Sequence, residues 1–463
     1  MTVPTNQDIS PVAVSSPPVH LAQGIELIGE YEGSGYAEPR YLVKRADGQM
    51  VALSLLLYLV VQNVAACSDV SEVAARVSAQ YGRGVSPENI DYLVDKRLQP
   101  LGVAAVGAAP PSPVRDDRSD LLRLSLRTSM VPPRLVNSVA AILRHLFHPP
   151  VVLAVLVSIV LADGWFIGHG VGAGVRGLLQ EPLWILVLFA TIFASAVFHE
   201  SGHASACRYS GGTPGSIGMG LYLVWPAFYT DVTDSYRLSR AGRVRTDLGG
   251  IYFNVIFALG TFGVYAVTGW EPLLVVVLVQ HFEILHQFTP VIRLDGYYVV
   301  SDLAGVPDLF RHVGPAAKRL LRREQTGSTF HNLRPRAQRI ICLWLVFSAP
   351  VLAFGGWQLV TNTPRVLSSS LSSLQQQAQQ FDHAMGAGSW VLVALALLSI
   401  VLLVLPPTGI VLIYVKLAQS LYRTSVSWAE KASSLPRWPL VTSAWLTVVM
   451  LLGRLWHVPS GVW

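Results

Sequence analysis

The feature that most restricts how this 463-residue chain can fold is a set of seven apolar runs. Each run is close to the length that crosses a lipid bilayer. A helix needs about 20 apolar residues to span the ~30 Å hydrocarbon core. With 52% hydrophobic and 13% charged residues, the chain is too apolar for a soluble protein of this size. The predicted spans are 150–168, 183–206, 247–268, 272–291, 339–361, 389–415 and 438–456. We therefore predict a multi-pass α-helical protein of the cell membrane.

The distribution of Lys and Arg predicts the orientation of these spans, because basic residues accumulate in cytosolic loops. Basic residues cluster before the first predicted span and after the second, fourth and sixth, whereas the intervening connections carry few. This alternation predicts a cytosolic N-terminus. The net charge of +6 is concentrated in these loops, so it suits membrane orientation and indicates no nucleic acid partner.

The second predicted span ends in His199-Glu200-Ser201-Gly202-His203, an HExxH pattern. Residues four apart share a helix face, so both imidazoles can hold one cation while Glu200 acts as general base on a bound water. Each ionisable group in a membrane helix costs roughly 2.5 to 3.5 kcal/mol, which favours a functional interior. The alternative is an interhelical polar cluster without metal.

A catalytic zinc site typically has three protein ligands, so a third must come from elsewhere in the chain. The three cysteines lie far apart without a CxxC pair, which leaves nitrogen and oxygen ligands. The fourth predicted span ends on the cytosolic side, and Leu294-Asp295-Gly296 follows it at the depth of the histidines. We predict that His199, His203 and Asp295 hold Zn²⁺. Alternatively, Asp295 is a boundary aspartate in a turn made by Gly296.

Together these motifs resemble the site-2 protease family of intramembrane zinc metalloproteases, and in particular its bacterial peptide zinc metalloprotease branch. The resemblance covers roughly residues 183–302 and includes Thr289-Pro290 and Asp295-Gly296-Tyr297-Tyr298, with Thr289 where the family usually has Asn. It implies a zinc endopeptidase in which Asp295 completes the site.

The stretch from Gly249 to Asn254 is similar to the family's Gly-Pro-x-x-x-Asn, with Gly250 in place of Pro. By this resemblance Asn254 helps to bind the substrate carbonyl, since an amide can donate to a developing oxyanion. An interhelical hydrogen bond is the alternative for Asn254.

His281, Glu283 and His286 add ionisable groups to the fourth predicted span. They either support the zinc ligands or form a structural polar network.

Residues 211–234 have too many Gly and Pro breaks for a helix and carry β-favouring residues between them. We predict a sheet or re-entrant hairpin beside the active site. Its edge could bind an unwound substrate by strand addition. Asp231 and Asp234 are expected to cap or bond within this loop.

The N-terminal part reads as a hairpin over 40–53 followed by three helices, at about 54–66, 69–82 and 86–98. This α+β pattern resembles a small winged-helix domain of the kind that recognises leader peptides. A regulatory or docking role is an equal alternative. The predicted organisation is a disordered N-terminus (1–23), the soluble winged-helix-like domain (24–108), a basic linker (109–148), the metalloprotease core (149–302), a basic cytosolic loop (303–338) and further C-terminal transmembrane helices (339–463).

The sequence therefore predicts an intramembrane zinc endopeptidase that cuts near the cytosolic leaflet. Its expected substrate is a membrane-associated peptide or a single-span membrane protein, with a possible leader peptide at the N-terminal domain. The alternative is a non-catalytic zinc-binding membrane protein that binds a ribosomal peptide or helps to export it.

Overall fold

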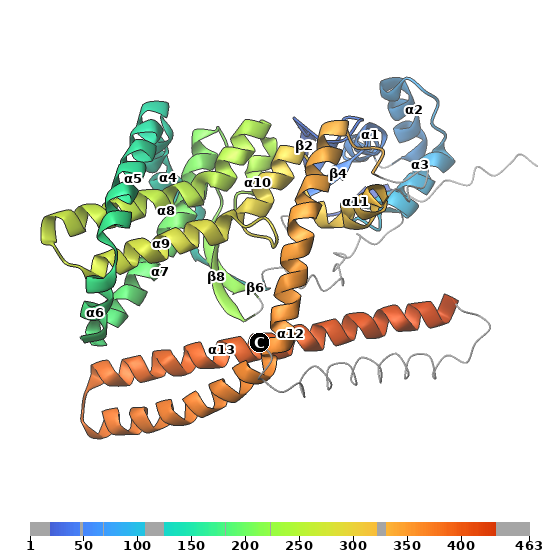
Figure 1. Ribbon diagram of the computed structural model, residues 1–463. Coiled ribbons are helices and arrows are strands. Elements are labelled where there is room, and N and C mark those ends of the chain that lie inside the picture. Colours follow the sequence, from blue (N-terminus) through green and yellow to red (C-terminus); the bar gives the residue numbers. More distant parts are fainter. Residues whose placement is uncertain are drawn as a thin grey trace, which may run out of the picture. The chain divides into compact units, whose positions relative to one another are not determined.

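A computed structural model describes residues 19–46, 50–67, 69–106, 125–180, 182–222, 224–321 and 330–431 (Figure 1). The chain divides into two compact units, Met1–Ser119 and Asp120–Trp463. The seventh predicted span, 438–456, and most of the predicted disordered N-terminus lie outside the described residues.

The first unit contains the predicted hairpin and helices. Its strands are β1 (Val19–Leu21), β2 (Glu26–Glu30), β3 (Tyr41–Lys44), β4 (Met50–Leu53) and β5 (Ala104–Val106), and its helices are α1 (Leu55–Val64), α2 (Val70–Tyr81), α3 (Pro87–Leu93) and the π-turn η1 (Val94–Leu98). The strands β2, β3 and β4 form an antiparallel sheet, and β1 pairs with β5. Side chains of Ser54, Asp69 and Ser86 cap the three α-helices at their N-termini.

One prediction for this unit needs correction. Residues 19–21 fall in the stretch predicted to be disordered, yet they form β1, and Val19 is completely buried in the core of the unit. The sequence pattern could not indicate this because the partner strand lies about 85 residues further along the chain. The winged-helix assignment stays a prediction.

The second unit is mainly helical. Its elements are β6 (Ser125–Val131), α4 (Pro133–Leu143), η2 (Arg144–Phe147), α5 (Pro149–His169), α6 (Gly172–Gln180), α7 (Pro182–Tyr209), β7 (Ile217–Tyr222), β8 (Trp225–Thr230), η3 (Thr233–Arg237), α8 (Arg240–Thr268), α9 (Pro272–Phe288), α10 (Asp295–Ala304), η4 (Leu309–His312), α11 (Val313–Leu320), α12 (Pro335–Gly386) and α13 (Trp390–Lys431). The predicted cytosolic loop, 303–338, thus contains short helical segments.

Five helices in the described part of the chain are long and apolar enough to cross a membrane: α5, α7, α8, α12 and α13. The fourth predicted span corresponds to α9, which is apolar but has only 17 residues. The polar stretch that follows the fifth predicted span continues α12 without a break. It has no Gly or Pro from Arg365 to Met385, and its Leu, Gln and Ala residues favour a helix.

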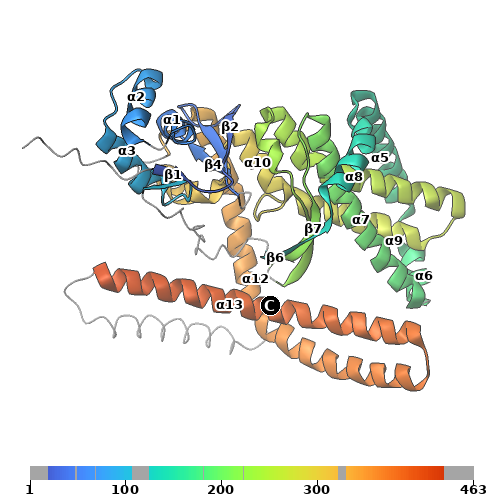
Figure 2. The same cartoon turned by 180° about the vertical axis from the view of Figure 1, so that it is seen from behind.

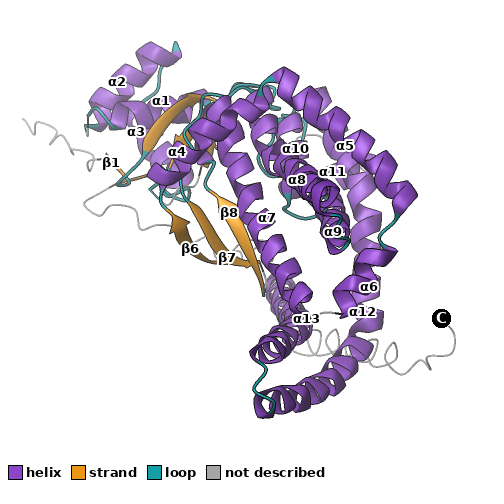
Figure 3. Cartoon of the chain, turned by 90° about the vertical axis from the view of Figure 1, so that its left-hand side faces the viewer, coloured by secondary structure: helices purple, strands orange, loops and turns teal. Residues whose placement is uncertain are grey.

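A three-stranded antiparallel sheet of order β6-β7-β8 lies beside α7 (Figure 3). The hairpin of β7 and β8 occupies the segment predicted to contain β-structure. The third strand, β6, comes from the stretch predicted to be a basic linker, as does α4, so this stretch contains regular structure. Phe228 of β8 packs edge-on against Phe193 of α7, with ring centroids 5.0 Å apart.

Helices α7, α8 and α9 pack together with α5 in one bundle (Figure 2). Two glycines permit a close crossing of α7 and α8. A Cβ on Gly249 would lie 2.6 Å from the carbonyl oxygen of Gly202, and a Cβ on Gly202 would collide with the carbonyl of Gly249. This crossing brings the α8 backbone directly against the HExxH segment. The Ser195 hydroxyl donates to Gln280 at 2.7 Å and ties α7 to α9.

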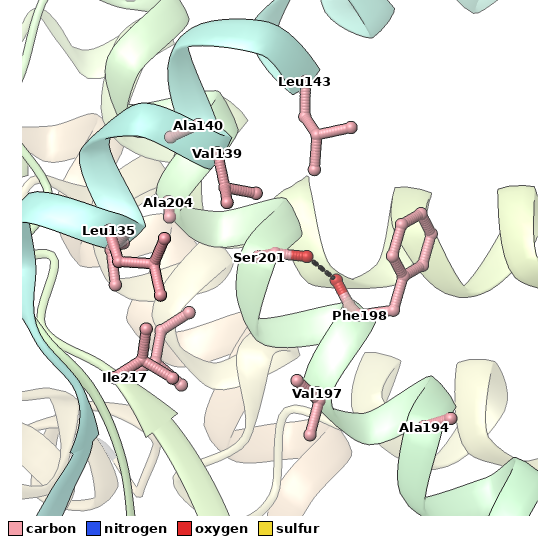
Figure 4. Close-up of a pocket in the computed structure, with 12 residues that line it drawn as sticks. Leu135, Val139, Ala140, Leu143, Ala194, Val197, Phe198, Ser201, Ala204 and Ile217 are labelled. Atoms are coloured by element: carbon pink, nitrogen blue, oxygen red, sulfur yellow. Dashed lines mark hydrogen bonds between the residues drawn. The ribbon is translucent and has the colours of Figure 1, made fainter.

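The opposite face of α7 borders an apolar cavity of about 370 Å³ beneath α4 (Figure 4). Its lining includes Leu135 and Val139 from α4 and Val197 and Ala204 from α7. The Ser201 hydroxyl in the lining already donates to the Phe198 carbonyl at 2.6 Å. Because residues 197, 201 and 204 lie about half a turn away from the two histidines, this cavity is separate from the candidate site.

Candidate metal centre

The three predicted metal ligands meet in the second unit, with His199 and His203 on α7 and Asp295 at the first position of α10. The Nε2 atoms of the histidines are 3.2 Å apart, and Asp295 Oδ2 lies 3.3 Å from His199 Nε2 and 3.4 Å from His203 Nε2. Tetrahedral zinc with bonds of about 2.0 to 2.1 Å places its ligand atoms about 3.3 to 3.4 Å apart. The triangle therefore fits a zinc ion without rearrangement.

The backbone of α8 orients one of the imidazoles. His203 Nδ1 lies 2.8 Å from the Thr246 carbonyl oxygen, which can only accept, so Nδ1 carries the proton. The Nε2 lone pair is then directed at the metal position, as in zinc sites where the second ring nitrogen donates to a carbonyl. His199 Nδ1 is buried and has no hydrogen-bond partner in the described part of the chain.

Asp295 begins α10 shortly after the end of α9, and its Oδ2 atom faces the Nε2 atoms of both histidines. The next residue must be small, because a Cβ on Gly296 would collide with the Phe288 carbonyl and lie 3.0 Å from the carbonyl oxygen of Gln287. Gly296 thus allows α10 to begin where its first carboxylate reaches the histidines.

Gly250 on α8 lies directly against the two imidazoles. A Cβ at this position would lie 2.5 Å from His203 Nε2 and closer still to His199 Nε2. The sequence pattern marked Gly250 only as a departure from the family's Pro. Its role becomes visible when α8 is packed against the HExxH face of α7.

Glu200 is buried and directly follows His199 on α7. Its carboxylate accepts a hydrogen bond of 2.6 Å from the hydroxyl of Thr230, and its own backbone carbonyl is an alternative acceptor at 2.9 Å. Thr230 is the last residue of β8, so the sheet is connected directly to the predicted general base. No sequence pattern predicts this contact, because no spacing rule links residues 30 positions apart.

Asn254 is buried on α8 one turn after Gly250, on the same helix face as the position that borders the histidines. This placement is compatible with its predicted role in substrate binding, which stays a prediction.

The other predicted polar residues lie outside the three-ligand group of the described chain. His281 Nε2 pairs with Asp163 of α5 at 2.9 Å, and its Nδ1 donates to the Val277 carbonyl at 2.7 Å, which favours the structural-network alternative for this residue. Asp231 accepts from the Thr233 amide at 3.1 Å, and Asp234 accepts from the Thr213 amide at 2.8 Å. Both aspartates therefore bond within the loop, as predicted.

Comparison with known proteins gives one relevant similarity. Over 121 residues, which are 26% of this chain, the sequence is 26% identical to the Bacillus subtilis (strain 168) protein named "Putative peptide zinc metalloprotease protein YydH". The match covers 47% of that protein, so the chain spans about half the length of this relative. No protein-family profile and no solved structure matches the chain. The similarity agrees with zinc as the metal and with a metalloprotease as the class of enzyme.

Proposed function

We propose that the protein is an intramembrane zinc endopeptidase of the site-2 protease type, which cuts a membrane-associated or membrane-threaded peptide near the cytosolic leaflet. The observation that carries this proposal is the triangle of ligand atoms at the spacing of tetrahedral zinc. Both histidines of the triangle and Glu200 lie in an apolar helix long enough to cross a membrane. The similarity to a zinc metalloprotease supports the same class of reaction.

The surrounding residues suit peptide hydrolysis. Bound zinc would supply a Lewis acid that lowers the pKa of water to about 7 and polarises the scissile carbonyl. Glu200 would take a proton from the attacking water and deliver it to the leaving amine. The Asn254 amide would donate to the carbonyl oxygen as negative charge develops there. His203, fixed by its bond to the Thr246 carbonyl, keeps its Nε2 lone pair for the metal throughout.

The sheet beside α7 offers a way to present an extended substrate. Amides in a helical peptide are already hydrogen bonded and are poorly accessible to attack. Within the described sheet β8 is an edge strand, and its last residue contacts Glu200. A peptide that adds to this edge would run toward the general base in an extended conformation.

The remaining assignments follow the loop charges and the N-terminal pattern. The protein would cross the cell membrane several times with a cytosolic N-terminus, as the positive loops indicate. The unit that contains residues 24–108 would bind the leader segment of a peptide substrate through its hairpin edge. A single-span membrane protein is the other class of substrate that this arrangement would accept.

Metal analysis tests the proposal directly. Protein purified in detergent is expected to hold one zinc ion per chain, measured by inductively coupled plasma mass spectrometry. Asp295→Ala removes a proposed ligand. Loss of a residue that only supports a ligand lowers metal affinity roughly 10- to 100-fold, so this variant should lose more zinc affinity than that. Chelation should stop cleavage, and added zinc should restore it. A chain that holds zinc but generates no new peptide termini in membranes would instead support a binding protein that assists peptide export.

Thr230 provides a second test, because its hydroxyl holds the carboxylate of the proposed general base. Thr230→Val keeps the shape of the side chain and removes the donor. A hydrogen bond to a charged group contributes about 1.5 to 3 kcal/mol, so we expect kcat to fall roughly 10- to 100-fold with unchanged zinc content. Thr230→Ser should restore most of the rate. If Thr230→Val and Thr230→Ser cleave equally well, the hydroxyl does not position Glu200.

A further inference from the structure

A completely buried arginine joins α8 to α10. The side chain of Arg243 is 0% exposed, its Nε donates to Asp302 Oδ1 at 2.9 Å, and its Nη1 donates to the Leu238 carbonyl at 2.7 Å. Taking a guanidinium and a carboxylate out of water costs several kcal/mol per ion, which a buried pair recovers only with good geometry. Neither residue takes part in the proposed chemistry, so this pair requires another explanation.

The position of Asp302 suggests what the pair does. Asp302 lies seven residues after Asp295 on α10, which places both carboxylates on one helix face, two turns apart. Arg243 and Asp247 lie one turn apart on α8, and the Asp247 carboxyl also hydrogen bonds to Asp302. Asp302 is therefore held at two points on α8. The same stretch of α8 carries the Thr246 carbonyl that orients His203.

The Arg243 guanidinium and the Asp302 carboxylate face each other directly, so each buried charge has an opposite charge beside it. Separating the two helices would leave each charge buried without this partner, so the pair gives α10 little freedom to slide along α8.

We propose that the Arg243–Asp302 ion pair is a positioning device that places Asp295 against the two histidines and thereby sets the affinity of the site for zinc. It acts through the rigid α10 helix, which begins at Asp295 and passes Asp302 two turns later. This inference depends on one part of the proposed function, namely that the site binds zinc. Arginine is required because its planar guanidinium group donates to Asp302 and to the Leu238 carbonyl at the same time. A lysine ammonium cannot do this in the same geometry.

The test is the zinc dissociation constant of full-length protein in detergent, measured by competition with a chromogenic chelator. Asp302→Asn and Arg243→Lys are each expected to weaken zinc binding by roughly 10- to 100-fold. Arg311→Gln is the matched control, because it removes an ion pair to Asp308 in which the arginine side chain is 71% exposed. Zinc binding by this control should equal that of the wild type.

A double-mutant cycle separates positioning from a general loss of structure. In an Asp295→Ala background, Asp302→Asn should weaken zinc binding no further, because the ion pair acts through the missing ligand. If the two losses add, or if folded Asp302→Asn binds zinc like the wild type, the proposal is overturned. Should Asp302→Asn fail to fold, an unchanged dissociation constant for Arg243→Lys overturns it equally. Wild-type protein that binds zinc but cuts no peptide would refute the proposed function and leave this inference standing.

Discussion

Glu200→Gln is expected to retain one zinc ion per chain and to lose peptide cleavage by about 10²- to 10⁴-fold, the usual contribution of a general acid–base residue. Glutamine has nearly the same shape and can still accept the hydrogen bond from Thr230, so β8 should stay in place. It cannot take a proton from water. Glu200 is not part of the three-ligand group, so the metal site should be intact.

Membranes from cells that express the wild type or Glu200→Gln offer a readout that requires no known substrate. New peptide termini, identified by mass spectrometry, should arise only with the wild type, while zinc content is equal in the two purified proteins. Glu283→Gln is the control, since Glu283 is another glutamate in an apolar helix but lies outside the metal group of the described chain. Wild-type cleavage by Glu200→Gln would rule out Glu200 as the general base.

The local part of the metal centre was predictable from sequence because helix geometry fixes it. Residues four apart on α7 share a face, so the spacing of His199 and His203 determines that their imidazoles converge. Asp295 was predicted by combining that spacing with the alternation of loop charges, which brings the ends of two predicted spans to one depth, and the family resemblance implied the same residue. The structure places its carboxylate within 3.4 Å of both histidines, so the convergence of the three side chains was predictable, whereas their role as zinc ligands stays a prediction.

The contacts that support the ligands were not predictable, because each depends on packing between distant segments. Thr230 contacts Glu200 through the docking of β8 on α7, and Thr246 orients His203 through the crossing of α7 and α8. Neither residue belongs to a motif with a chemical meaning of its own. The same limitation explains β6, since a short strand within a charged stretch is recognised only through its partner β7.

Gly250→Ala is expected to abolish high-affinity zinc binding, with a loss of at least about 100-fold, while the protein stays folded. The added methyl group would lie 2.5 Å from His203 Nε2 and closer to His199 Nε2, so it would occupy the space that the ion and its two nitrogen ligands need. Alanine favours a helix over glycine by roughly 0.5 to 1 kcal/mol, so α8 itself should become no less stable. The dissociation constant for zinc and the thermal unfolding temperature, measured on the same sample, separate these two effects.

Gly260→Ala is the matched control, because Gly260 lies on the same helix and a Cβ there would meet no atom within 4 Å. It should bind zinc like the wild type and unfold at the same or a slightly higher temperature. If Gly250→Ala also keeps wild-type zinc affinity, the metal does not lie between α7 and α8 at the level of Gly250. In that case the convergence of His199, His203 and Asp295 would describe a polar cluster rather than a metal centre.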